Sequence, residues 1–307
     1  MGSSIKLSVV ICSYNRRDYI VGAIDSLYRQ TLSRDRYEVL VVDNNSKDDT
    51  ERLCRDYIDS HRDGHIYYYS ELRQGASFAR NTGAAHSLGE LLVFMDDDAV
   101  AESDFLERIL LFFEQHPGAG GLGGRIIPRY IPSEPKWMSH YVSSLVGHFD
   151  YSQETVEFSP QRYPLESNMV VRKVDFDQVG GFNTDLPGVK GTLRIGGEGK
   201  EFFFKLKAIG RTIWYDPTVK VEHIVEVKKL TREYLYRVAS GIGRGESVRT
   251  QAIGRLTYYK KIAEYLYKLG GSVVLGILYA LKGTPGRSMP VIRFRIDALK
   301  GLTDNRR

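Results

Sequence analysis

Residues 91–98 of the chain read LLVFMDDD, five apolar side chains followed at once by three aspartates. Such a short apolar run predicts a buried strand whose carboxyl end carries Asp96, Asp97 and Asp98. Adjacent carboxylates repel one another, and a divalent cation such as Mg²⁺ or Mn²⁺, which prefers oxygen ligands, offsets that repulsion. A solvated acidic turn is the alternative. Ligands of α/β sheets bind beyond the carboxyl ends of strands, which favours the metal interpretation.

Segments with strand and helix patterns alternate on both sides of this stretch. Short runs rich in Val and Ile predict strands, and apolar residues spaced by three and four predict helices. The predicted strands cover residues 7–12, 38–42, 66–69 and 91–95, and the predicted helices cover residues 19–30, 49–60, 77–86 and 104–115. This alternation is typical of βαβ units, so we expect an α/β fold with a mostly parallel sheet.

Polar side chains also follow the first two predicted strands. Ser13, Tyr14 and Asn15 come after the first strand, and Asp43 ends the second. Since the carboxyl ends of parallel strands meet at one edge of a sheet, we expect these residues near the aspartate triplet. Asp43 could accept a hydrogen bond from a base or a ribose, although aspartate is also common in plain turns.

Three further charged residues are candidates for the same site. Arg80, on a predicted helix, could pair with a phosphate or with the aspartates, or form an ordinary surface ion pair. Glu198 begins a helical pattern after two glycines, which fits either a helix cap or a general base. His223 follows a strand pattern and could be a metal ligand or a hydrogen-bonded structural residue.

Charge is distributed unevenly along the chain. Residues 244–307 contain 13 Lys and Arg against 4 Asp and Glu, a net of +9, whereas the rest contains 30 against 34. Such a basic segment predicts an anionic surface partner. It includes an apolar stretch at residues 270–281, too short to span a bilayer but suited to a membrane interface. A helical appendage that packs on the rest of the chain, or a contact in a homo-oligomer, is the alternative.

Other features exclude several classes of protein. Two cysteines, Cys12 and Cys54, form no disulfide framework and no zinc motif, which favours a reducing compartment. Residues 1–4 begin no secretory signal and no apolar run reaches about 20 residues, so we expect a cytoplasmic protein, peripheral on the inner face of the cell membrane. No G-x-G-x-x-G follows the first strand, which disfavours a dehydrogenase. No nucleic-acid partner is predicted.

Taken in order, these motifs resemble those of the family 2 glycosyltransferases over about residues 7–245. The matching pieces are SVVICSYNR at 8–16, VDNNS at 42–46, ARNTG at 79–83, the aspartate triplet, SNMVVR at 167–172, GGF at 180–182, GE at 197–198 and His223. The resemblance implies a GT-A-type α/β fold, Rossmann-like, with helices flanking the sheet. It also implies a glycosyltransferase domain at 1–229, with a nucleotide-binding half at 1–118 and an acceptor half at 119–229. Residues 230–307 would form a basic helical extension.

The resemblance further implies an enzyme that moves a sugar, with inversion, from a nucleotide sugar to an acceptor hydroxyl. A UDP-sugar is the favoured donor, and a glycan or lipid-linked acceptor of polysaccharide, cell-surface glycan or glycolipid synthesis is expected. The implied donor-binding residues are Ser13, Tyr14, Asn15, Asp43, Arg80, Asp96, Asp97 and Asn168. Asp98 and His223 would hold the cofactor, Mn²⁺ or Mg²⁺.

One departure from the family pattern concerns the catalytic base. Similar chains often read Gly-Glu-Asp-x-Glu where residues 197–201 read GEGKE, so Gly199 replaces the carboxylate frequently assigned as base. Glu198 is therefore the predicted base, and Glu201 is a weaker candidate because it should point along the helix. A nucleotidyltransferase and a catalytically inactive nucleotide-sugar binder remain the alternative functions.

Overall fold

The structure is a computed structural model that describes residues 5–186, 188–190, 193–195 and 197–304. The chain divides into two compact units. The first comprises Met1–Ile127, Phe149–Thr184 and Gly199–Ile224, and the second comprises Pro128–His148, Asp185–Glu198 and Val225–Arg307. The predicted boundaries at 118/119 and 229/230 divide the chain by function, and they stay a prediction.

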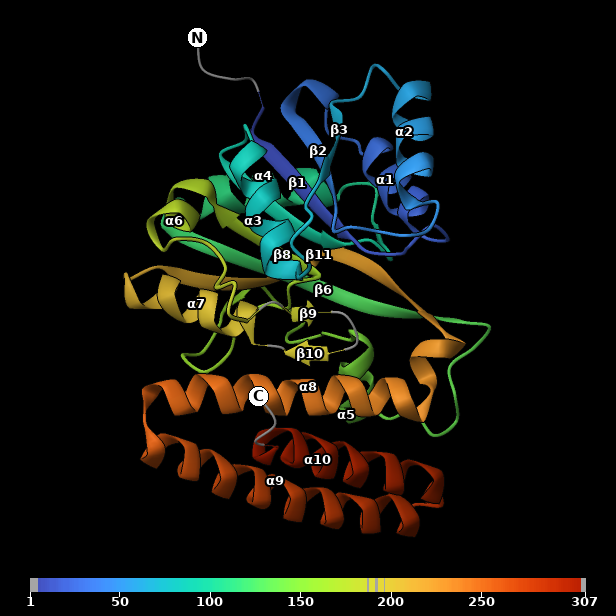
Figure 1. Cartoon of the computed structure of the whole chain (residues 1–307), viewed down its shortest axis with the longest axis vertical. Helices are drawn as coiled ribbons and strands as arrows, with labels where there is room; N and C mark the ends of the chain where they lie inside the picture. The colour runs from blue at the N-terminus through green and yellow to red at the C-terminus, as the bar shows by residue number, and fades with distance from the viewer. Residues whose placement is uncertain (1–4, 187, 191–192, 196, 305–307) are drawn as a thin grey trace. The chain divides into compact units, whose positions relative to one another are not determined.

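A mixed sheet forms the centre of the first unit (Figure 1). Within the described residues it has nine strands in the order β3-β2-β1-β4-β8-β6-β11-β5, with β7 paired to β11. These are β1 (Leu7–Ser13), β2 (Tyr37–Asp43), β3 (Ile66–Ser70), β4 (Leu91–Asp96), β5 (Ala99–Ala101), β6 (Ala119–Ile131), β7 (Val156–Glu157), β8 (Asn168–Arg172) and β11 (Thr212–Glu226). Neighbours from β3 to β4 are parallel, whereas β8 is antiparallel to both β4 and β6. All four predicted strands are confirmed to within about a residue at each end.

Helices cover both faces of this sheet. They are α1 (Ile20–Tyr28), α2 (Thr50–Ser60), α3 (Ala76–His86), α4 (Phe105–Gln115), α6 (Lys173–Gln178) and α7 (Glu198–Ala208). Apolar side chains of α1, α2 and α4 share one core cluster with Val9 and Val93, whereas those of α3, α6 and α7 share another with Val10 and Phe94. Because successive residues of a strand point to opposite faces of the sheet, the adjacent residues Val9 and Val10 belong to two separate core clusters. The four predicted helices in residues 19–115 are confirmed.

The second unit is mostly helical. Its long helices α8 (Arg232–Ile253), α9 (Arg255–Leu281) and α10 (Ser288–Thr303) pack against one another (Figure 1). α8 and α10 approach backbone to backbone, since a Cβ on Gly243 would lie 2.0 Å from the carbonyl oxygen of Ala298. The unit also contains α5 (His140–Ser143) and an antiparallel pair, β9 (Gly188–Lys190) and β10 (Leu193–Ile195). The prediction of helices after residue 230 is confirmed.

None of the helices in the described part of the chain is both long enough and apolar enough to cross a bilayer.

Candidate active site

The carboxyl ends of three parallel strands place the predicted residues at one edge of the sheet. In the register of β1 with its neighbours, Ser13 lies opposite Asp43 on β2, and Cys12 lies opposite Asp96 on β4. The three strands are buried along almost their whole length, and apart from Ser8 and Glu38, near the starts of β1 and β2, their polar residues lie at the carboxyl ends. The sheet therefore gathers these side chains, which are far apart in the sequence, at a single edge.

The aspartate triplet contacts two basic side chains. Asp98 Oδ1 lies 2.7 Å from His223 Nε2, and Asp98 Oδ2 lies 3.3 Å from Arg16 Nη2. Arg16 Nε is also 3.3 Å from Asp97 Oδ1. His223 reaches Asp98 because β5 pairs with β11, which sets Ala99 opposite His223. The contact thus depends on two strands that lie more than 100 residues apart.

Asp96, Asp98 and His223 form a group that could hold a metal ion. Each offers one ligand atom, and these atoms lie within 4.8 Å of one another. Two carboxylates and one neutral imidazole suit Mn²⁺, and the carboxylates also suit Mg²⁺. The donor set and its compactness therefore fit the cation predicted for this site.

The electrostatic environment of Asp97 reflects the crowding of negative charge. Burial raises the pKa of Asp97 to about 7, the neighbouring Arg16 opposes the rise, and Asp98 and Asp96 add to it. A carboxyl group keeps its proton more readily when it is buried beside other carboxylates. Positive charge at this edge therefore stabilises the ionised triplet, and in the folded chain Arg16 supplies part of it.

Asp43 is buried and held by two donors. Its Oδ1 accepts a hydrogen bond from the backbone N–H of Ser46 at 2.9 Å, and its Oδ2 accepts one from the Tyr68 hydroxyl at 2.7 Å. Burial, followed by the bond to Asp43, raises the pKa of Tyr68, so this hydroxyl keeps its proton and remains a donor. An ionised carboxylate offers about four acceptor positions. Asp43 is thus fixed in place with acceptor capacity left for a ligand.

The loops after β1 and β2 are tied together by Asn15. Its backbone N–H donates to Ser46 Oγ at 2.9 Å, and its Oδ1 accepts from the backbone N–H of Lys47 at 2.7 Å. Asn15 adopts a φ of 54°, a left-handed conformation that asparagine tolerates better than most residues. Tyr14, beside it, is half-buried. Both loops are therefore held at the edge that carries Asp43.

Arg80 does not lie on the surface, so the interpretation as a surface ion pair is wrong. Its side chain on α3 is only 8% exposed, and the guanidinium carbon lies 5.4 Å from the centre of the Phe182 ring. Burial raises the pKa of Cys12 to about 12, and the charge of Arg80 lowers it while Asp96 and Asp97 raise it. Arg80 is thus a buried cation whose charge acts at the end of β1.

Asn168 takes part in the packing of three strands. It is fully buried, and its Nδ2 donates to the carbonyl oxygens of Arg125 at 3.1 Å and Val219 at 3.0 Å. These bonds tie β8 to β6 and β11. A contact between Asn168 and the donor stays a prediction, and the structure gives this residue a part in the sheet.

The start of α7 presents the predicted base and an unpredicted carboxylate. Glu198 is buried, and Glu201 pairs with Lys205 at 2.9 Å along the helix. The backbone N–H of Gly199 donates to Glu166 Oε1 at 2.9 Å, and a Cβ on Gly199 would lie 2.1 Å from the same oxygen. The carboxylate of Glu166 therefore occupies the space in which a side chain at position 199 would begin.

Sequence reasoning missed two residues of this edge, Arg16 and Glu166. Arg16 closes the SVVICSYNR motif, so a cation after the first strand was the available signal. Glu166 gave no signal of its own. It lies two residues before Asn168, which pairs with Met95 of β4, and the antiparallel register therefore carries Glu166 towards the aspartate end of β4.

Comparison with protein families gives one matching family model. The model described as glycosyl transferase family 2 matches residues 8–180, more than half of the chain. The glucosyl-dolichyl phosphate glucuronosyltransferase of Haloferax volcanii is 26% identical over 226 residues, which cover 71% of this chain and 69% of that protein. The minor teichoic acid biosynthesis protein GgaB of Bacillus subtilis is 34% identical over 110 residues, 36% of this chain but only 12% of that protein.

Solved structures share the fold. The mannosyltransferase PcManGT from Pyrobaculum calidifontis, in complex with GDP-Man and Mn²⁺, gives a TM-score of 0.68 at 20% identity and covers 98% of this chain and 88% of its own. S. aureus TarS 1–349 in complex with UDP gives a TM-score of 0.54 at 17% identity, with 97% and 89% covered. These likenesses confirm the predicted GT-A-type fold.

Proposed function

This chain belongs to glycosyl transferase family 2, and from that premise we propose that it transfers a sugar from a nucleoside diphosphate sugar to an acceptor hydroxyl. The observation that carries the proposal is the group formed by Asp96, Asp98 and His223 at one edge of the sheet. Ser13 and Asp43 end their strands at the same edge. A cation site beside polar groups suits a ligand with a diphosphate at one end and a nucleoside at the other.

The donor would lie along the loops after β1 and β2. Asp43 has acceptor positions left over for a ring N–H of the base, and Tyr14 and Asn15 would line the nucleoside. Arg80, a buried cation, would act on the phosphates. A UDP-sugar remains the predicted donor; one structural neighbour was solved with UDP and another with GDP-Man, so both nucleotides belong in the test.

Asp98 and His223, together with Asp96, would hold Mn²⁺ or Mg²⁺. When bound, such an ion stabilises the charge that builds on the departing diphosphate, as a Lewis acid. The chain itself orients Asp98 from two sides, because His223 contacts one carboxylate oxygen and Arg16 contacts the other. Asp96 would also lie near the ribose or the sugar, and Asp97 would lie between Asp96 and Asp98 on the donor side.

Inversion requires a base on the face of the sugar opposite the leaving group, where it takes the proton of the acceptor hydroxyl. Glu198 is the predicted base. Glu201 is disfavoured because its ion pair with Lys205 gives it a role within the helix. Glu166 joins Glu198 as a candidate, since its carboxylate is held at the N-terminus of α7.

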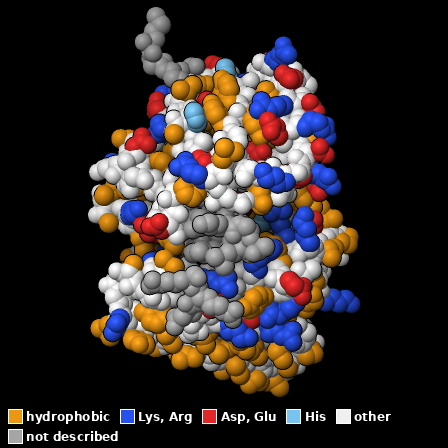
Figure 2. Space-filling view, in the orientation of Figure 1, with side chains coloured by type: hydrophobic (Ala, Val, Ile, Leu, Met, Phe, Trp, Pro, Cys, Tyr) orange, Lys and Arg blue, Asp and Glu red, His pale blue; other side chains and the backbone are white. Residues whose placement is uncertain are grey.

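The acceptor would be a glycan or a lipid-linked sugar, and the chain would work on an anionic membrane surface. Support for the membrane comes from the basic segment 244–307 and from the exposed side chains of α9. These include Val273, Val274, Ile277, Leu278 and Leu281, which are 42% to 78% exposed. Figure 2 shows hydrophobic side chains gathered where α9 lies in Figure 1. An amphipathic helix with flanking lysines is typical of interfacial binding.

The proposal is tested by thermal unfolding with UDP-, GDP- and dTDP-sugars, each with and without Mn²⁺. A ligand at 100 times its Kd stabilises the native state by about 2.7 kcal/mol. We expect one nucleotide class to stabilise the chain strongly, only with the metal, and Asp98→Asn to remove the effect. Asp59→Asn, which changes an exposed carboxylate on α2, is the matched control and should behave as wild type. If no nucleotide stabilises the chain with Mn²⁺, the proposal is wrong.

A catalytically inactive nucleotide-sugar binder is the second candidate, favoured by Gly199. The two candidates differ in turnover. An enzyme releases nucleoside diphosphate in the presence of a suitable acceptor, and Glu198→Gln or Glu166→Gln then lowers that release while donor binding persists. A binder shows metal-dependent donor binding and no release with any acceptor.

A further inference from the structure

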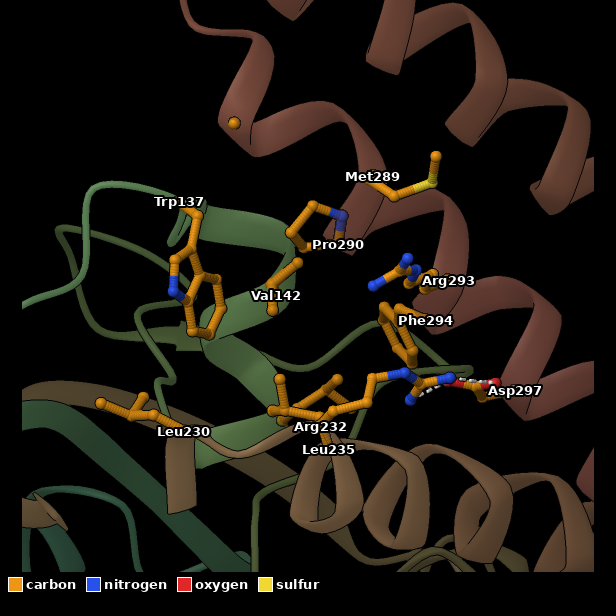
Figure 3. A pocket seen from close by; sticks show the side chains of 12 residues that line it. Trp137, Val142, Leu230, Arg232, Leu235, Met289, Pro290, Arg293, Phe294 and Asp297 are labelled. Carbon is orange, nitrogen blue, oxygen red and sulfur yellow. Dashed lines mark hydrogen bonds and ion pairs between the residues drawn. The ribbon is translucent and has the colours of Figure 1, made fainter. Parts of the chain in front are cut away.

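The second unit contains a pocket that the proposed chemistry does not use. Its volume is about 440 Å³, within the range of small-molecule sites. The wall is mostly apolar and includes Trp137, Val142, Leu235, Met289, Pro290 and Phe294, which come from the segment around α5 and from α8 and α10 (Figure 3). Apolar surface of this extent favours an apolar occupant, because its burial removes both surfaces from water.

The polar groups of the wall leave a single positive charge unbalanced. Arg232 forms a two-point ion pair with Asp297, at 2.6 and 2.9 Å, so these two charges neutralise each other. Arg293 also lines the pocket, and in the described part of the chain no carboxylate lies within ion-pairing distance of it. Figure 3 shows its guanidinium turned toward the space between Val142 and Phe294.

This wall chemistry discriminates between classes of ligand. A sugar or nucleotide would bury hydroxyl and amide groups against apolar side chains without hydrogen-bond partners, which is costly. A hydrocarbon chain has no polar groups, so its burial does not carry this cost. An anionic group at its end would be attracted by Arg293. The unit also carries the exposed apolar side chains of α9, which suit contact with lipid. A lipid that bears a phosphate satisfies both features, since a phosphate offers a guanidinium several acceptor oxygens.

We infer that this pocket binds the hydrocarbon chain of a lipid phosphate, with Arg293 against the phosphate. That the pocket binds such a lipid is independent of the proposed sugar transfer. That the lipid carries the acceptor sugar rests on the proposed function. Binding to the pocket needs neither nucleotide nor metal ion. It can therefore succeed or fail independently of the transfer reaction.

The natural fluorescence of the chain allows a direct test. The sequence has two tryptophans, Trp137 in the pocket wall and Trp214 packed against the core of the first unit. The probe is decyl phosphate with a bromine on its terminal carbon, titrated below its micelle concentration into the full chain. Bromine quenches a tryptophan that it touches. We expect saturable quenching in wild type and none in Trp137→Phe, in which Trp214 remains as the internal reference.

Two pairs of variants test the contributions of the ligand's hydrocarbon chain and of its phosphate separately. Gly286 lines the pocket and a Cβ there would meet nothing within 4 Å, so a side chain can begin at this position without a clash, and we expect Gly286→Phe to narrow the pocket. Gly118→Phe, at an equally open glycine of the first unit, is its control. Arg293→Gln should weaken decyl phosphate roughly fivefold to tenfold and leave decanol unchanged. Lys300→Gln removes an exposed charge from the same helix and should change neither.

The length of the ligand's hydrocarbon chain gives a further test. Each added CH₂ should lower the Kd of the alkyl phosphate about fourfold until the pocket is full. The inference is overturned if Trp137 is not quenched, if Gly286→Phe binds the probe as wild type does, or if inorganic phosphate binds as tightly as decyl phosphate. Equal affinity for decanol and decyl phosphate would remove the lipid phosphate as ligand. A dimer that Gly286→Phe dissociates would make the pocket an interface between copies. Nucleotide binding by Gly286→Phe should stay at the wild-type level.

Discussion

Replacing Gly199 by alanine should destabilise the chain, against the usual effect of this change in a helix. Gly→Ala within a helix ordinarily stabilises by about 1 kcal/mol, because alanine loses less backbone entropy on folding. At position 199 the new Cβ would lie 2.1 Å from Glu166 Oε1 and 2.5 Å from Glu166 Cδ. The carboxylate must move away, and its bond from the Gly199 N–H, now 2.9 Å, is lost. A hydrogen bond to a charged group contributes about 1.5–3 kcal/mol, so we expect a net loss of about 0.5–2 kcal/mol.

A double-mutant cycle with Glu166→Ala isolates this contact. When the carboxylate is absent the space at position 199 is free, so Gly199→Ala should then stabilise the chain by about 1 kcal/mol. The change that Gly199→Ala makes in the free energy of unfolding therefore has opposite signs in the wild-type and Glu166→Ala backgrounds. Urea unfolding of the four proteins measures the free energies, with equal m-values as the condition for comparing them.

Gly22 provides the matched control. It lies in the first turn of α1, as Gly199 does in α7, and a Cβ there would meet nothing within 4 Å. Gly22→Ala should stabilise the chain by about 1 kcal/mol in both backgrounds. If Gly199→Ala stabilises the wild-type chain as much as Gly22→Ala does, Glu166 does not occupy the position of the missing side chain, and the reasoning fails.

Further predictions concern catalysis, the membrane and pH. If Glu166 is the base, Glu166→Gln should lower kcat by about 100-fold or more and leave the donor Kd unchanged, and Glu198→Gln should lower kcat less. A larger loss of kcat in Glu198→Gln would assign the base to Glu198. Ile277→Glu, on exposed α9, should reduce flotation with anionic vesicles, whereas Leu111→Glu on α4 should not; equal flotation of both variants would contradict membrane docking. Hydrogen bonds from Arg73 and Thr82 lower the pKa of Glu71 to about 2, although burial acts to raise it. Its contribution to stability is therefore complete above about pH 5 and is lost as the pH falls towards 2, so Glu71→Gln should destabilise the chain at pH 7 and not at pH 2.

The sequence predicted those features that local patterns determine. Strands and helices in residues 7–115 follow from the spacing of apolar side chains, and the ends of β1, β2 and β4 follow from where that spacing gives way to polar residues. Once the sheet is parallel, Asp43 and Asp96 must share an edge, so their proximity was also predictable. A helical pattern after residue 230 was sufficient to predict α8, α9 and α10.

Features that depend on pairing between distant segments could not be predicted in this way. His223 contacts Asp98 only because β11 pairs with β5, and no local pattern specifies that register. The buried side chain of Arg80 lies against the ring of Phe182, about 100 residues further along the chain. Helical spacing alone places an arginine on a helix, and it does not tell whether another segment will cover it.

Gly199 illustrates how a departure in sequence can be compensated in space. Read along the chain, the glycine removes a carboxylate, and that loss is the reason for considering an inactive binder. In the folded chain the carboxylate of Glu166 lies where the side chain at position 199 would begin, and the backbone N–H of the same glycine holds it. A larger residue at position 199 would expel Glu166, so the absence of a side chain is a condition for the presence of this carboxylate. Gly199 therefore does not by itself argue against catalysis, because the start of α7 keeps two acidic groups, Glu198 and Glu166.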